Sequence, residues 1–214
     1  MHSKYSDIRN NYERNRLHRD DLESAPFRQF KNWLEEAIAA EDTEPTAMSL
    51  ATVDATGQPT QRIVLLKDVS DKGISFFTNY NSSKGCQLAN NPKVSANFFW
   101  PVLERQVRWE GRVVKLPAVA SDNYFASRPR ESRIGAWASP QSEKISDDGL
   151  LVKRFQEFEQ KFQGGEVPRP PHWGGYLIIP HQVEFWQGRP NRMHQRFVYS
   201  CQRDGSWELA QLAP

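Results

Sequence analysis

Short segments with the composition of β-strands follow one another along much of the chain, with only turn residues between many of them. In the first half these segments are AMSLATV, TQRIVLLKD, ISFFTN, VSANFFW and LERQVRWEGRVVKL. Near the C-terminus they are GYLIIP, QVEFWQG, RMHQRFVYS and SWELAQL, where Asp204-Gly205 suits a tight hairpin turn. Consecutive strands joined by short turns favour antiparallel pairing, and so many short strands favour closure into a barrel. The sequence therefore predicts an antiparallel β-barrel.

Helical patterns flank these strands, so the expected class is mainly β with flanking helices (α+β). Pro26 suits the first turn of a helix, and apolar residues recur after it at helical spacing: Phe27, Phe30, Trp33, Leu34, Ala37 and Ile38. We expect shorter helices at 82–90 and 117–127, and a longer one carrying Leu150, Leu151, Phe155, Phe158 and Phe162. Residues 1–22 are polar and basic. They predict a mobile N-terminal arm in front of one domain at 23–214.

The charge balance disfavours several functional classes. The 214 residues carry 28 Lys and Arg against 26 Asp and Glu, a net charge of +2, whereas general nucleic-acid or membrane binders show a stronger bias. No apolar stretch is long enough to span a bilayer, and the N-terminal residues lack the apolar core of a secretion signal. The two cysteines are far apart and form no CxxC motif. We therefore expect a cytoplasmic protein that binds neither nucleic acid nor membranes.

Several common motifs of catalytic and binding sites do not occur. The chain has no Gly-x-Gly, so both the dinucleotide fingerprint and the phosphate loop are missing, and it has no Gly-x-Ser-x-Gly elbow. Its five histidines have no ligand spacing with cysteines or carboxylates, so we expect no metal site. Any phosphorylated ligand would have to be bound by side chains.

The segment from Arg192 to Arg196 is the most informative one. If it is a strand, Arg192, His194 and Arg196 share one face and repel each other unless an anion lies between them. This favours a phosphate pocket, because arginine offers bidentate hydrogen bonds, although a solvated outer face remains the alternative. Trp186 could form the wall for a planar ligand or belong to the core.

Two further cationic segments could bind phosphate. Residues 124–133 hold three arginines, two serines and a tyrosine, and they could also be a solvated charged loop. In the segment from Arg62 to Lys67, four apolar residues separate two cations, which also suits a core strand with charged ends. Arg62 and Lys67 are five residues apart, so in a regular strand they point to opposite faces and contact different groups.

Taken together, these segments resemble the pyridoxine/pyridoxamine 5′-phosphate oxidase family from about Ile8 to Pro214. The resemblance is carried by RIVLLK at 62–67, FTN at 77–79, NNP at 90–92, LERQV at 103–107, SRPRESRIGAWAS at 127–139, QS at 141–142, KFQGGEVPRPPHWGG at 161–175, VEFWQG at 183–188 and the terminal LAP.

The resemblance implies an FMN-binding split barrel, acting as a homodimer with two flavin sites at the subunit interface. It implies oxidation of pyridoxamine or pyridoxine 5′-phosphate by oxygen to pyridoxal 5′-phosphate and hydrogen peroxide. The positions implied to bind FMN are Arg62, Ile63, Val64, Leu65, Leu66, Lys67, Phe77, Thr78, Ser83, Lys84, Gln106, Gln141, Ser142, Trp186 and Arg196. Those implied to bind substrate are Lys67, Tyr124, Arg128 and Ser132 at its phosphate, Arg192 and His194 as catalytic residues at its ring, and Arg9 and Tyr12 in the closing arm.

The sequence departs from the family's pattern at four of these positions or beside them. Met193 and Gln195 replace the usual Leu and Asp, Ser83 stands where Arg is frequent, and Phe77 stands where Tyr is common. Ser83 and Phe77 remove a cation and a hydroxyl, which predicts weaker retention of flavin.

Three other functions compete with this interpretation. A phenazine-pathway flavin oxidase resembles this family, but such relatives tend to lose the lysine at position 67 and the RPRES-type segment, both present here. A flavin- or vitamin-binding module without turnover is favoured by Gln195 and Ser83. An RNA-binding barrel is disfavoured by the near-neutral charge.

Overall fold

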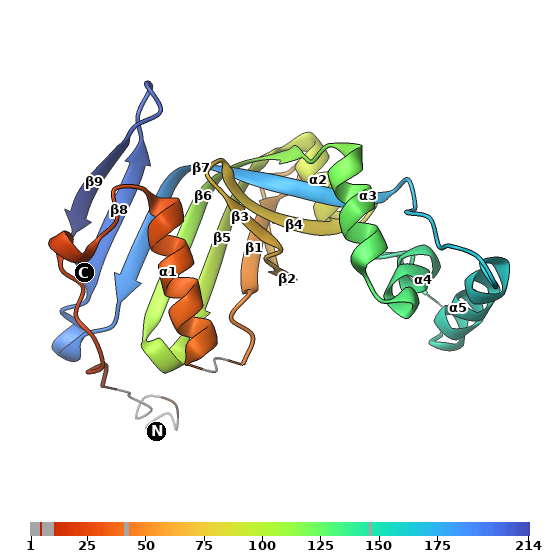
Figure 1. Ribbon diagram of the computed structural model, residues 1–214, viewed down its shortest axis with the longest axis horizontal. Helices are drawn as coiled ribbons and strands as arrows, with labels where there is room; N and C mark the ends of the chain where they lie inside the picture. The colour runs from red at the N-terminus through yellow and green to blue at the C-terminus, as the bar shows by residue number, and fades with distance from the viewer. Residues whose placement is uncertain (1–4, 6–10, 41–42, 146) are drawn as a thin grey trace.

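Nine antiparallel strands form one curled sheet in the computed structural model, which describes residues 5, 11–40, 43–145 and 147–214 (Figure 1). The strands are β1 (Ala47–Val53), β2 (Pro59–Leu65), β3 (Asp68–Ser70), β4 (Gly73–Asn79), β5 (Lys93–Trp100), β6 (Arg105–Lys115), β7 (Trp173–Gln187), β8 (Gln195–Cys201) and β9 (Trp207–Leu212). Their order is β2-β1-β5-β6-β7-β4-β3, while β8 pairs with β7 and with β9. The predicted antiparallel barrel of class α+β is confirmed.

The two ends of this strand order meet at the link between β2 and β3. Leu66 N donates to Thr46 O at 2.9 Å, and Lys67 N donates to Ser75 O at 2.8 Å. The backbone there connects the edge formed by β1 and β2 to the edge formed by β3 and β4. Lys67 is therefore held at the closure of the barrel.

Strand β7 differs from the expectation, because one 15-residue strand replaces the two segments GYLIIP and QVEFWQG. Its first half pairs with β4 and its second half with β8, which lets the sheet split along its length. Pro180 lies opposite Gly111 at a register shift, and such a bulge tolerates a residue without an N–H. A Cβ on Gly111 would lie 2.2 Å from Ile179 O, so the close approach requires glycine.

The helices are α1 (Pro26–Ala39), α2 (Ser83–Asn90), α3 (Ala118–Ser127), α4 (Arg130–Ala138) and α5 (Gly149–Lys161). Helix α1 buries Phe30 and Trp33, and the Phe30 ring lies 4.9 Å from Phe98 and 5.0 Å from Trp109. Helices α3, α4 and α5 lie at one end of the molecule, with β8 and β9 at the other (Figure 1). Residues 124–133, considered above as a charged loop, instead form the end of α3 and the start of α4.

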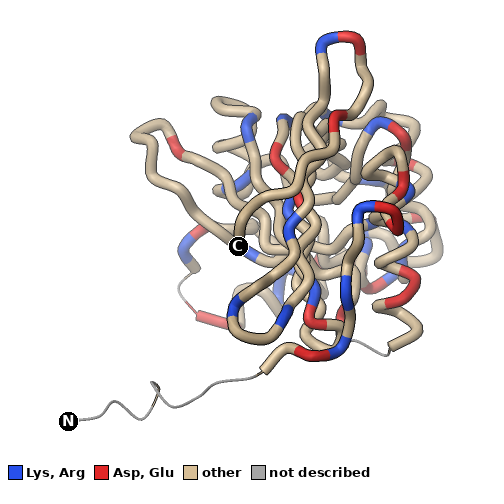
Figure 2. The backbone as a smooth tube through the Cα atoms, turned by 90° about the vertical axis from the view of Figure 1, so that its left-hand side faces the viewer, with Lys and Arg blue, Asp and Glu red and all other residues tan. Residues whose placement is uncertain are grey.

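Positions of basic and acidic residues are interspersed along the backbone in the view of Figure 2. This agrees with the near-neutral net charge. Within the described ranges, no helix combines the length and apolar character needed to cross a membrane.

Candidate active site

A pocket of about 700 Å³ lies between the sheet and helices α3 and α4, within the size range of small-molecule sites. It collects side chains from β2, β4, α2, α3, α4 and the loop that follows α4. The predicted site residues that line it are Ile63, Val64, Leu65, Lys67, Phe77, Thr78, Lys84, Tyr124, Arg128, Ser132 and Gln141. The structure therefore brings together all four residues implied for the substrate phosphate and many of those implied for FMN.

One wall of the pocket is a stack of aromatic rings that ends in a guanidinium. The Phe77 ring stacks on Tyr124 at 4.0 Å and on Trp173 at 5.4 Å, and Arg128 lies 4.8 Å from the centre of Trp173. Burial lowers the pKa of Arg128, and its buried Nη1 has no hydrogen-bond partner within the described chain. A half-buried cation with an unused donor fits an anionic ligand.

Lys84 is a second cation that the fold leaves without a carboxylate in the described ranges. Its Nζ donates to Gln141 Oε1 at 3.0 Å and to Thr78 Oγ1 at 3.2 Å. Burial lowers its pKa, and the nearby positive charge of Arg62 lowers it further. The protein therefore holds Lys84 where an added anion would stabilise its charged form.

Arg62 does not line this pocket. It donates to Leu50 O at 3.2 Å and to Thr60 Oγ1 at 2.7 Å. Lys67 lines the pocket, but it follows the end of β2 at Leu65, so strand alternation does not fix its direction relative to Arg62. That these two cations contact different groups stays a prediction. Leu66, Ser83 and Ser142 also do not line the pocket, and Leu66 is in the hydrophobic core.

The remaining predicted residues that the structure describes form a second group at the far end of the sheet. Gln106, Trp186 and Arg196 are neighbours across β6, β7 and β8, because the register pairs Gln106 with Trp186 and Trp186 with Arg196. The His194 ring lies 4.7 Å from Trp186, which is half-buried. This group lies around the β8 end in Figure 1, away from helices α3 and α4.

The expected strand over residues 192–196 is wrong for its first half. Strand β8 begins at Gln195, and Pro190–Arg192 form a short 3-10 turn in which Asn191 and Arg192 have φ of 57° and 61°. Pro190 has no N–H for a sheet ladder, so the chain turns before the strand can begin. Arg192 and His194 therefore do not share a strand face with Arg196 by alternation.

His194 is nevertheless held in a defined orientation. Its Nδ1 accepts a hydrogen bond from Arg189 N at 3.1 Å, which leaves Nε2 as the protonated nitrogen of the neutral ring. Burial and the charge of Arg192 lower the pKa of His194. The neutral ring is thus favoured at neutral pH.

The N-terminal segment lies on this second group. The Tyr12 ring contacts Trp186 at 5.7 Å and His194 at 5.9 Å, while Leu17 is buried and donates its N–H to Gln195 Oε1 at 2.7 Å. Gln195, the departure from the usual Asp, thus holds the arm. Arg9 lies outside the described residues, and the mobility of the arm stays a prediction.

Gly188 provides the space into which Tyr12 docks. A Cβ at this position would lie 2.7 Å from Cγ and 2.8 Å from Cβ of Tyr12. These atoms are close to the backbone, so Gly188→Ala should displace the arm itself. In Gly188→Ala we expect a protease to cleave the arm faster, and we expect a lower kcat/KM for the oxidation that the resemblance implies. Gly165→Ala is the control, because nothing lies within 4 Å of its added Cβ. Equal cleavage of both variants would contradict this docking.

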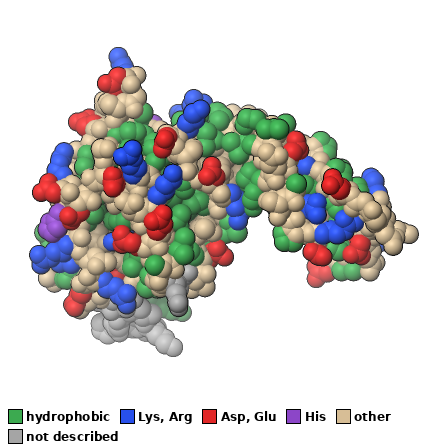
Figure 3. Space-filling view, in the orientation of Figure 1, with side chains coloured by type: hydrophobic (Ala, Val, Ile, Leu, Met, Phe, Trp, Pro, Cys, Tyr) green, Lys and Arg blue, Asp and Glu red, His purple; other side chains and the backbone are tan. Residues whose placement is uncertain are grey.

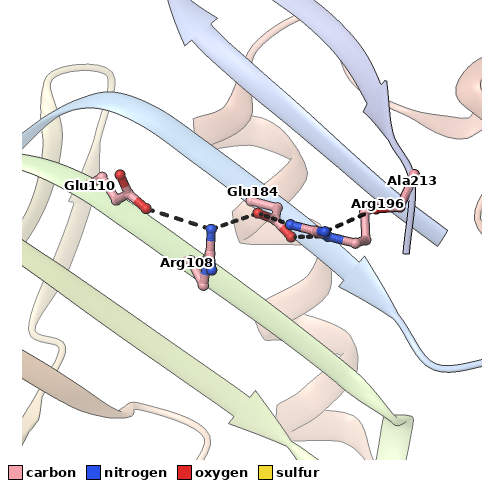
Figure 4. A network of polar contacts seen from close by, with 5 residues as sticks. All are labelled: Arg108, Glu110, Glu184, Arg196 and Ala213. Atoms are coloured by element: carbon pink, nitrogen blue, oxygen red, sulfur yellow. Dashed lines mark hydrogen bonds and ion pairs between the residues drawn. The ribbon is translucent and has the colours of Figure 1, made fainter. Parts of the chain in front are cut away.

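A buried carboxylate near the second group was not anticipated from the sequence. Glu184 on β7 is 2% exposed and pairs with Arg108 and Arg196 (Figure 4). Val183 and Phe185 on either side of it are also buried. Neighbouring residues of a strand face opposite sides of the sheet, so a carboxylate between two apolar residues predicts a solvent-facing side chain, and this pattern gives no signal for the buried ion pair.

Comparison with known proteins assigns the family. Residues 34–162 match the model described as pyridoxamine 5′-phosphate oxidase, and residues 173–214 match the pyridoxine 5′-phosphate oxidase C-terminal dimerisation region. A protein of Trichormus variabilis named pyridoxine/pyridoxamine 5′-phosphate oxidase is 50% identical over 214 residues, covering 100% of both chains. A protein of the same name from Cupriavidus necator is 50% identical over 99% of this chain and 100% of its own.

The chain belongs to the pyridoxamine 5′-phosphate oxidase family. Among solved structures, PhzG from Burkholderia lata in complex with tetrahydrophenazine-1-carboxylic acid has a TM-score of 0.88 at 30% identity, covering 94% of this chain and 100% of that one. In the chain described here, the part that matches the dimerisation region contains Trp186, Arg192, His194 and Arg196.

Proposed function

We propose that the chain is a pyridoxine/pyridoxamine 5′-phosphate oxidase that uses FMN and oxygen. The observation that carries the proposal is a pocket that holds Arg128, Lys67, Tyr124 and Ser132, where Arg128 Nη1 has no hydrogen-bond partner among the described residues. These are the residues that the family resemblance implies for the substrate phosphate. Relatives of this name match over the full chain at 50% identity.

The residues present fit FMN. Lys84 has no carboxylate partner in the described part and would hold the flavin phosphate together with Thr78 and Gln141. Residues 63–65 form the adjacent wall. Gln106, Trp186 and Arg196 lie away from this pocket in the same chain, so a second copy would bring them to the ring system. When bound, FMN accepts a hydride from the substrate and passes the electrons to oxygen.

The active form is proposed to be a homodimer in which each site takes residues from both copies. This is supported by the separation of the two residue groups at opposite ends of one chain (Figure 1). The helical end also projects from the main body and leaves an open hollow beside it (Figure 3). A second copy there would bring its Trp186, Arg192, His194 and Arg196 to the pocket of the first.

The residues of the protein would mainly bind and orient the substrate. Lys67, Arg128 and Ser132 hold the phosphate, while Arg192 and His194 hold the ring so that the 4′ carbon faces the flavin. The amine substrate reacts with oxygen and water to give pyridoxal 5′-phosphate, ammonia and hydrogen peroxide. The alcohol substrate and oxygen give pyridoxal 5′-phosphate and hydrogen peroxide.

FMN binding should weaken at alkaline pH because of Lys84. Its pKa in the free protein is below the ordinary value of 10.5, so it loses its proton, and its attraction for phosphate, at a lower pH than a normal lysine. Above that pKa the FMN dissociation constant should rise by up to about tenfold per pH unit. Fluorescence titration of apo-protein with FMN measures this. In Lys84→Met the alkaline rise should be lost, and the same rise there would assign it to another group.

The activity is tested by supplying FMN-loaded protein with pyridoxamine 5′-phosphate in air. Pyridoxal 5′-phosphate and hydrogen peroxide should form in equal amounts, and pyridoxine 5′-phosphate should give the same products without ammonia. A flavin-loaded dimer that produces neither would contradict the proposal. Turnover of tetrahydrophenazine-1-carboxylic acid instead would assign the phenazine activity.

A further inference from the structure

Glu184 is a buried carboxylate shared by two arginines from the neighbouring strands (Figure 4). Its Oε1 accepts from Arg196 Nε at 2.7 Å, and its Oε2 accepts from Arg196 Nη2 at 3.1 Å. The same Oε2 accepts from Arg108 Nη2 at 2.8 Å. Glu184 thus links β8 to β6 through the central strand β7.

These contacts leave Arg196 little rotational freedom. Its Nη1 also donates to Ala213 O at 2.9 Å, so the backbone near the C-terminus binds the one guanidinium nitrogen that Glu184 does not. A guanidinium has five N–H donors in a fixed planar fork, and three of them are used here. The two that remain lie one on each terminal nitrogen.

The network is better suited to orienting Arg196 than to stabilising the fold. Burying an ion pair costs much of what the pairing returns, so such pairs contribute little net stability. The side chains of Arg108 and Arg196 remain 38% and 26% exposed, while Glu184 is buried beneath them. The buried carboxylate therefore fixes the direction of a guanidinium that still reaches the surface.

We propose that Glu184 is a positioning residue of the flavin site. Glu184 clamps Arg196 so that the two remaining N–H groups of Arg196 face the FMN bound in that site. The inference rests on the proposed function, in which Arg196 contacts FMN. Without the clamp, Arg196 would keep its charge but lose its fixed direction. FMN binding would then have to order the Arg196 side chain, and this entropic cost would weaken the observed affinity for FMN.

Glu184→Gln tests the clamp with nearly unchanged shape. The amide keeps one acceptor but turns an N–H₂ group toward the guanidinium groups. The FMN dissociation constant of the apo-protein should rise by about tenfold or more, because each tenfold corresponds to about 1.4 kcal/mol. The matched control is Glu110→Gln, since Glu110 lies 3.6 Å from Arg108 and is half exposed. It should change FMN affinity by less than about twofold.

A double-mutant cycle separates positioning from a general loss of structure. If Glu184 acts through Arg196, Glu184→Gln should have no further effect on FMN affinity in an Arg196→Met background. Additive losses would show that Glu184 acts independently of Arg196, which overturns the inference. Should Glu184→Gln fail to fold, Glu184→Asp replaces it, because it keeps the charge one methylene further from Arg196. Wild-type affinity in that variant would also overturn the clamp.

The outcomes distinguish this inference from the function on which it rests. If the wild-type chain binds FMN and Glu184→Gln binds it equally well, only the positioning role is wrong. If the wild-type chain does not bind FMN at all, the proposed function is wrong and the clamp with it. Weaker binding in Glu184→Gln, wild-type binding in Glu110→Gln and a non-additive cycle together support the role of Glu184.

Discussion

Replacing Arg192 with methionine should lower kcat/KM for pyridoxamine 5′-phosphate by about 100-fold or more, while FMN remains bound. Arg192 is exposed at the turn between β7 and β8 and donates no hydrogen bond within the described part of the chain. Its charge is close enough to lower the pKa of His194. The substitution therefore removes a cation that is free to bind substrate and leaves the flavin contacts in place.

Arg203→Met is the control for Arg192→Met, because Arg203 is also exposed but lies between β8 and β9. Steady-state kinetics and the visible flavin absorbance of both variants should be compared. The control should retain wild-type turnover. Unchanged turnover in a flavin-loaded Arg192→Met protein would rule out the assigned role.

Replacing Arg128 with methionine should lower kcat/KM for pyridoxamine 5′-phosphate by roughly 30- to 1000-fold, mainly through KM. The buried Nη1 of Arg128 has no partner within the described residues, and burial lowers the pKa of the guanidinium. Methionine keeps apolar contact with Trp173 but cannot bind a phosphate. Because the buried charge is removed as well, the thermal stability of the apo-protein should be unchanged or higher.

Pyridoxamine without its phosphate is the control substrate for Arg128→Met. Wild-type protein should prefer the phosphorylated substrate strongly, and the variant should lose most of that preference. Kinetics with both substrates at fixed FMN saturation measure the ratio. A variant that retained the wild-type preference would show that Arg128 does not bind the phosphate.

Much of the fold follows from patterns that are local in the sequence. The alternating strands and the apolar spacing around Phe30 and Trp33 predict the sheet and α1, because each pattern fits one period of regular structure. The continuous strand β7 could not be predicted in this way. Pro180 suggests a strand end, and only the opposing Gly111 on β6 creates the bulge that accommodates it.

The candidate site was predicted less evenly than the fold. The family resemblance implies most of the pocket residues, but residue chemistry alone leaves the arginines of 124–133 as possible surface charges. Arg128 packs on the ring of Trp173, which is distant in sequence, and its Nη1 has no partner in the part of the chain that the structure describes. The seat for Tyr12 at Gly188 depends on tertiary contacts in the same way. Weaker flavin retention due to Ser83 and Phe77 stays a prediction.

The most direct test of the central claim is anaerobic addition of pyridoxamine 5′-phosphate to the FMN-loaded protein while the visible flavin absorbance is recorded. The account predicts that the flavin band bleaches and that admission of air restores it as pyridoxal 5′-phosphate accumulates. A bound flavin that stays oxidised with both pyridoxamine and pyridoxine 5′-phosphate would contradict the account.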